Sequence, residues 1–69
     1  MYPVRSSNLS AIGYDSVTKT LRIKFHKNGI YDFYNVPLQI YEGLMNANSK
    51  GKYFHKFIKD KYPYSKVHL

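Results

Sequence analysis

Cysteine and tryptophan are both absent from this chain of 69 residues, and only four of its residues are acidic. Without cysteine, neither a disulfide bond nor a cysteine-based metal site can stabilise the fold. A single domain of this size buries only about 60% of the surface that its unfolded chain exposes. The domain must therefore fold by apolar packing, to which eight tyrosines and four phenylalanines contribute large rings.

Long apolar runs are also missing, because no more than two apolar residues follow one another anywhere in the sequence. A membrane-spanning helix needs about 20, so none is predicted. The N-terminal stretch MYPVRSSNLS has neither an apolar run nor a small-residue cleavage site, and we expect no signal peptide. The lack of cysteine agrees with a reducing compartment, and a cytoplasmic location is expected.

The shortage of acidic residues leaves a net charge of +7, and most of it lies near the C-terminus. Residues 1–48 carry a net charge of +2, whereas residues 49–69 contain six lysines and one acid, Asp60, for a net charge of +5. A one-sided charge favours an acidic partner such as nucleic acid, an anionic membrane surface or an acidic protein.

The sequence predicts three strands, at residues 9–14, 20–26 and 30–36, after an irregular lead-in at residues 2–8. The clearest is 20–26, where Leu21, Ile23 and Phe25 alternate with charged residues, a pattern that buries one face of a strand. Residues 15–19 are typical of a turn, because Asp and Ser side chains can hydrogen-bond to their own backbone.

A loop of three residues, Lys27–Gly29, is predicted to join the last two strands, with Gly29 in the left-handed conformation. A two-residue Asn28-Gly29 loop would place the Asp32 carboxylate on the buried face, which is costly. The three-residue loop sets Phe25 opposite Tyr31 and Ile23 opposite Phe33 on the inner face, and Lys24 opposite Asp32 and Arg22 opposite Tyr34 on the outer face.

Two helices are predicted after the strands. The first follows Pro37, with Leu38, Tyr41, Leu44 and Met45 on one face. The second runs from Ser49 or Lys50 to about Lys61, and Pro63 ends it. Its core face is predicted to contain Tyr53, Phe54, Phe57 and Ile58, and its outer face Lys52, His55, Lys56 and Lys59.

These elements predict an α+β fold in one domain spanning residues 1–69. The expected architecture is a three-stranded antiparallel β-meander with two helices packed on one face, in the order βββαα.

The lysine face of the second helix has two interpretations. Most charged faces of amphipathic helices are simply solvated. This face is nearly all of one sign, whereas a solubilising face usually mixes both signs. In addition, Ser49 can cap the helix, and Gly51 leaves the first-turn amides open beside Lys50 and Lys52. That terminus is either an anion site or an ordinary serine cap.

No catalytic or metal site is predicted. His26, His55 and His68 lie far apart in the sequence without metal-ligand spacing, and the four acids form no close pair. We expect no enzymatic activity, no cofactor and no small-molecule substrate.

Three stretches together resemble the KTSC domain: SSNLSAIGYDSVTKTLRIKF (6–25), YDFYNVP (31–37) and ANSKGKYFHKFIK (47–59). This domain is a short module found at the C-terminus of some lysyl-tRNA synthetases and as stand-alone bacterial and phage proteins. The resemblance covers roughly Val4 to Tyr62. The family's Tyr-any-Tyr motif is Tyr31-Asp32-Phe33 here, with phenylalanine in place of the second tyrosine. The fusion to synthetases implies RNA as the ligand.

The prediction is therefore a non-enzymatic, basic module that binds nucleic acid through its phosphates, RNA rather than DNA. The predicted contacts are Ser49, Lys50, Gly51, Lys52, Lys56 and Lys59, with Arg22, Lys24 and Tyr34 on the open face of the sheet as a second surface. The alternative is a protein-interaction module whose basic face docks an acidic protein.

Overall fold

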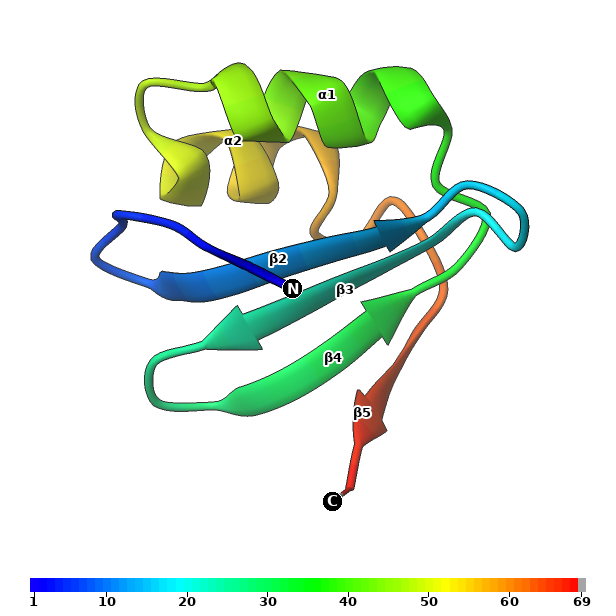
Figure 1. The fold of residues 1–69 in the computed structure, drawn as a ribbon, viewed down its shortest axis with the longest axis horizontal. Helices are drawn as coiled ribbons and strands as arrows, with labels where there is room; N and C mark the ends of the chain where they lie inside the picture. Colours follow the sequence, from blue (N-terminus) through cyan, green and yellow to red (C-terminus); the bar gives the residue numbers. More distant parts are fainter. Residues whose placement is uncertain (69) are drawn as a thin grey trace.

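The computed structural model describes residues 1–68 and shows a five-stranded sheet with two helices on one side of it (Figure 1). The strands are β1 (Tyr2–Pro3), β2 (Leu9–Asp15), β3 (Thr20–Phe25), β4 (Gly29–Phe33) and β5 (Tyr64–Val67), and the helices are α1 (Leu38–Asn46) and α2 (Lys50–Phe57). The strands lie side by side in the order β1-β2-β3-β4-β5, and each neighbouring pair is antiparallel.

The predicted α+β class is retained, but the predicted three-stranded meander is wrong, because the sheet has two further edge strands. β1 forms within the expected lead-in and pairs with β2, and β5 follows Pro63 and pairs with β4. Both are too short to show an alternating pattern in the sequence. They form because β2 and β4 would otherwise present unpaired backbone groups at the sheet edges.

The hairpin between β3 and β4 has the predicted faces but a different register. Gly29 has the predicted left-handed conformation, with φ of +88°, yet it pairs with Phe25, so the loop is 26–28. The register is displaced by two residues, which keeps every side chain on its predicted face. It places Arg22 opposite Asp32, and the guanidinium donates two hydrogen bonds to the carboxylate, at 2.7 and 2.9 Å.

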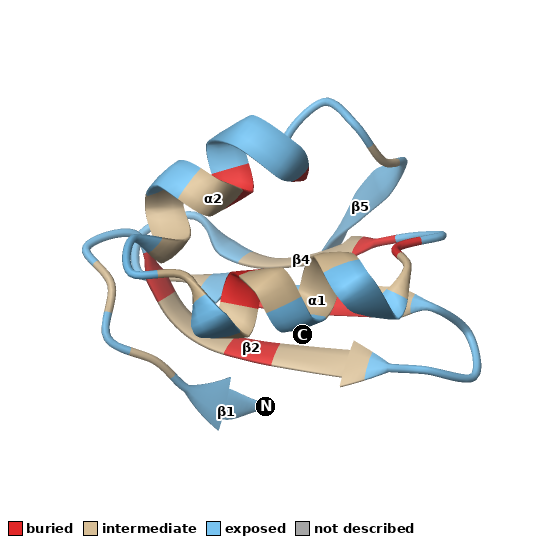
Figure 2. Ribbon diagram, turned by 90° about the horizontal axis from the view of Figure 1, so that it is seen from above, coloured by how far each residue is buried: buried red, intermediate tan, exposed pale blue. Residues whose placement is uncertain are grey.

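The core lies between the sheet and the helices, where buried residues are red in Figure 2. Its members are Leu9, Ile12, Leu21, Ile23, Phe33, Val36, Leu44, Phe54 and Ile58. α1 rests on β2 through Tyr41, whose ring stacks on Tyr14 with a centroid distance of 4.7 Å. The Tyr14 hydroxyl donates a hydrogen bond to the Val36 carbonyl. Burial of this side chain, and to a smaller extent the negative charge of Asp15, raise the pKa of Tyr14.

α2 is attached to the sheet by Phe54, whose ring lies 5.2 Å from Phe25 and 5.5 Å from Phe33, both in edge-to-face contact. The buried line along the helix continues to Ile58, four residues later. The helices approach each other at Gly43, where a side-chain carbon would collide with the Tyr53 hydroxyl. Glycine at this position therefore lowers the helix propensity of α1 but makes room for α2.

Three predictions about the helices are wrong. α2 ends at Phe57 rather than near Lys61, because Ile58 leaves the helical conformation and Asp60 has a left-handed φ of +62°. Phe57 is 40% exposed and lies outside the core, with its ring centroid 4.6 Å from that of Tyr53. Leu38, at the first position of α1, is likewise exposed rather than on the core face.

Lys50 has a structural role that its charge alone did not reveal. Its ammonium donates hydrogen bonds to the backbone carbonyls of Met45 and Ala47, each at 3.1 Å. These carbonyls lie at the C-terminal end of α1, where intrahelical partners are missing and the helix dipole is negative. Lys50 therefore ties the end of α1 to the start of α2.

Phe54→Ala should lower the free energy of unfolding by about 3–5 kcal/mol, because it empties a buried aromatic position. Phe57→Ala should cost only about 1 kcal/mol, since its ring is partly exposed. Urea denaturation of both variants measures the difference. Equal losses would show that α2 is not attached through Phe54.

Lys50→Met should lower the free energy of unfolding by about 1 kcal/mol, because it removes two hydrogen bonds from a charged donor at a helix end. Lys52→Met is the matched control, since its side chain is exposed, and should change stability by no more than about 0.5 kcal/mol. Urea denaturation measures both. If the two variants are equally stable, Lys50 does not cap α1.

Candidate functional site

The N-terminus of α2 is capped as the sequence predicted. The Ser49 hydroxyl accepts a hydrogen bond from the Lys52 amide at 3.4 Å. A side-chain carbon at Gly51 would lie 3.3 Å from the Asn8 side-chain nitrogen, so the loop before β2 lies against this helix end. Ser49, Gly51, Lys52 and Lys56 line a shallow hollow of about 540 Å³ with Ser7, Asn8 and His55. We call it the capping hollow.

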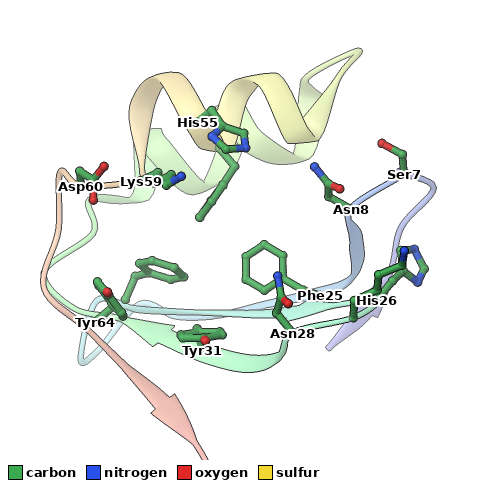
Figure 3. Close-up of a pocket in the computed structure, with 13 residues that line it drawn as sticks. Ser7, Asn8, Phe25, His26, Asn28, Tyr31, His55, Lys59, Asp60 and Tyr64 are labelled. Atoms are coloured by element: carbon green, nitrogen blue, oxygen red, sulfur yellow. The ribbon is translucent and has the colours of Figure 1, made fainter.

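A second, larger depression lies between α2 and the sheet. This groove has a volume of about 560 Å³ (Figure 3). Its walls contain five aromatic rings, those of Phe25, Tyr31, Phe33, Phe54 and Tyr64. Its polar residues are Ser7, Asn8, His26, Lys27, Asn28, His55, Lys59 and Asp60. Figure 3 shows His55, Lys59 and Asp60 on the α2 side and Phe25, Tyr31 and Tyr64 on the sheet side.

The alternation of β4 and its pairing with β5 explain the aromatic floor. Tyr31 and Phe33 point to the helix side of the sheet, whereas Asp32, between them, points to the outer face beside Arg22. Tyr64 is paired with Phe33 across β4 and β5, and their ring centroids are 5.8 Å apart. The Tyr31 and Tyr64 centroids are 5.9 Å apart. Phe33 is buried, but Tyr64 is 59% exposed.

The two depressions adjoin, because Ser7, Asn8 and His55 line both. Lys52 and Lys56 lie at the capping hollow and Lys59 at the groove, so the predicted lysine face follows α2 from one to the other. Within residues 1–68 none of these three lysines forms an ion pair. The Lys56 ammonium instead lies 5.2 Å from the centroid of the Phe57 ring.

The second predicted surface, on the outer face of the sheet, is largely occupied by its own contacts. Arg22 donates a hydrogen bond to the Asp32 carboxylate. This hydrogen bond, and to a smaller extent the negative charge of the carboxylate, raise the pKa of Arg22. The Tyr34 hydroxyl is hydrogen-bonded to Ser65 of β5. Lys24, also exposed, lies on this face away from the α2 lysines. The structure thus separates the predicted site residues into two groups on opposite faces.

The groove was not predicted from the sequence. Phe25, Tyr31 and Phe33 were expected on the inner face of the hairpin, and Tyr64, Lys27 and Asn28 were not among the predicted site residues. His26 and His55, for which no metal-ligand spacing was found, both line the groove. Tyr64 reaches the groove by pairing with β4, and β5 is too short to be recognised in the sequence, so no sequence signal pointed to the groove.

Neither a metal site nor a membrane-spanning helix is found in the part of the chain that the structure describes. Over residues 1–68 no three side chains of His, Cys, Asp or Glu lie close enough to hold a metal ion. Neither helix in this range has the length and apolar character needed to cross a membrane.

Comparisons with known proteins identify relatives along most of the chain. It is 48% identical over 54 residues to a lysine–tRNA ligase of Trichormus variabilis, covering 78% of this chain and 10% of that protein. A lysine–tRNA ligase of Nostoc sp. is 44% identical over 61 residues, covering 88% of this chain and 11% of that protein. The chain thus spans about a tenth of the length of these ligases.

Smaller relatives match along nearly their whole length. A protein of Tsukamurella paurometabola is 32% identical, with 90% of this chain and 92% of that protein aligned. The crystal structure of a KTSC domain protein from Yersinia pestis superimposes with a TM-score of 0.95 at 38% identity, covering 96% of this chain and 93% of that chain. The model of the KTSC domain matches residues 5–62. This chain belongs to the KTSC domain family.

Proposed function

We propose that this chain is a non-enzymatic, cytoplasmic module that binds nucleic acid, with RNA favoured over DNA. The observation that carries the proposal is the exposed lysine row Lys52, Lys56 and Lys59. The first two lie on α2 and the third just beyond its end, and none forms an ion pair within residues 1–68. Ammonium groups in such a row can contact successive phosphates, and the release of counterions then drives binding.

Charge and relatives both support this function. The net charge of +7 includes +5 from residues 49–69, which contain α2. Two relatives are lysine–tRNA ligases, enzymes whose name specifies a tRNA. A module that matches about a tenth of each of these ligases occurs within enzymes that act with a tRNA, which favours RNA as its ligand. Of the predicted contacts, Lys50 is committed to α1, so Lys52, Lys56 and Lys59 remain the proposed phosphate contacts, beside Ser49 and Gly51.

A protein-interaction module that docks an acidic protein is the second candidate. It is favoured by Phe57, which is 40% exposed, since aromatic side chains are enriched at protein interfaces. An acidic polypeptide would then compete for the same lysines.

The test compares two double variants that remove equal charge, Lys52→Gln/Lys56→Gln on α2 and Lys19→Gln/Lys24→Gln elsewhere. Binding of a labelled single-stranded RNA is measured by fluorescence anisotropy over a series of salt concentrations. With about three phosphates contacted by these lysines, the parent should show a log–log salt slope near −2, from ~0.7 per contact. The α2 variant should lose about 1.4 of this slope, and the control variant should keep it.

Absence of binding by the parent at low salt, or equal slopes for both variants, would contradict the proposal. Displacement of the RNA by polyglutamate at matched charge concentration, with no preference for RNA, would favour the protein-interaction alternative. Thermal unfolding of each variant confirms that both remain folded.

A further inference from the structure

We infer that the groove between α2 and the sheet binds an unstacked base of a single-stranded nucleic acid, while the neighbouring phosphates lie on the α2 lysines. This inference rests on the proposed function, and it adds the stacking of a base, which involves no charge, to the phosphate contacts. It also specifies the class of ligand, because the bases of a duplex are stacked on one another and cannot enter a groove of this kind.

The first reason is the aromatic surface left open. Protein interiors are normally close-packed, yet here five rings border a space of about 560 Å³, within the usual range for ligand pockets. Tyr64 is 59% exposed, and Phe25 and Tyr31 are partly exposed beside it. The open part of these rings can contact a planar group, which gains stacking energy from it.

The second reason is the charge of the rim. Lys27 and Lys59 are exposed at the groove, together with His26 and His55, and the one acidic lining residue is Asp60. This balance favours an anionic ligand over a neutral or cationic aromatic one. An aromatic floor beneath a basic rim is the combination with which proteins hold single strands, since the rings stack on bases and the cations contact the backbone.

The third reason is continuity with the lysine row. Ser7, Asn8 and His55 line both depressions, so a backbone that follows Lys52 and Lys56 reaches the groove without a break. The side-chain amides of Asn8 and Asn28 stand at the groove and can both donate and accept hydrogen bonds at the edge of a base. The site can therefore hold one base while the chain continues along α2.

The experiment uses the parent protein and three variants, Tyr64→Ala, Tyr64→Phe and Tyr2→Ala. Tyr2 is an exposed tyrosine of β1, at the opposite edge of the sheet, and serves as the matched control. Fluorescence anisotropy is recorded with three probes of equal length: oligouridine, an abasic ribose-phosphate oligomer, and an RNA duplex.

The parent should bind oligouridine at least fivefold more tightly than the abasic oligomer and the duplex, the lower end of the effect of one stacked base. Tyr64→Ala should lose at least fivefold in affinity for oligouridine and keep its affinity for the abasic oligomer. Its salt slope should stay that of the parent, because no charge is removed. Tyr64→Phe and Tyr2→Ala should bind as the parent does.

Equal binding of all three probes by the parent would overturn the inference while leaving phosphate binding intact. This comparison involves no substitution, so it holds even if Tyr64→Ala weakens β5. Unchanged oligouridine binding by Tyr64→Ala would also overturn it. Failure of every probe to bind at low salt would instead reject the proposed function itself.

Discussion

The contact of the Phe54 ring with Phe25 and Phe33 is the interaction on which the rest of the structure depends. α2 has only eight residues and buries one of them, Phe54, with Ile58 following at its C-cap. An isolated helix of this length is unstable in water, so its packing on the sheet must hold it. Phe54 also forms part of the groove wall. One side chain thus holds the lysine row in place and shapes the groove beside it.

Position, rather than residue type, determines what each lysine of this region does. Lys50 is half-buried and bonded to two carbonyls, so its charge is already satisfied within the fold. Lys52 and Lys56 lie one helical turn apart on the exposed side of α2. Lys59 follows the end of the helix and stands at the groove. The sequence presents these lysines as one run, but the fold separates them into a structural cap and an open surface.

The sequence predicted most reliably what short-range patterns determine. The alternation of Leu21, Ile23 and Phe25 predicted the faces of β3, and Ser49 predicted the start of α2. β1 and β5 could not be predicted, because two and four residues carry too little pattern and form only where an edge of the sheet is available. Hydrophobic periodicity reveals neither the early end of α2, which is followed by a left-handed Asp60, nor the exposure of Phe57 in its last turn.

The groove results from these two unpredicted features acting together. Had α2 continued to Lys61, one further turn of about 6 Å would have extended the helix layer. Instead the chain turns after Ile58 and returns to the sheet, where the Pro63 carbonyl accepts a hydrogen bond from the Tyr34 amide. β5 then adds Tyr64 to a part of the sheet that borders the groove rather than the core. The segment after the early helix end therefore supplies Lys59 and Asp60 to the groove, and the added strand supplies Tyr64.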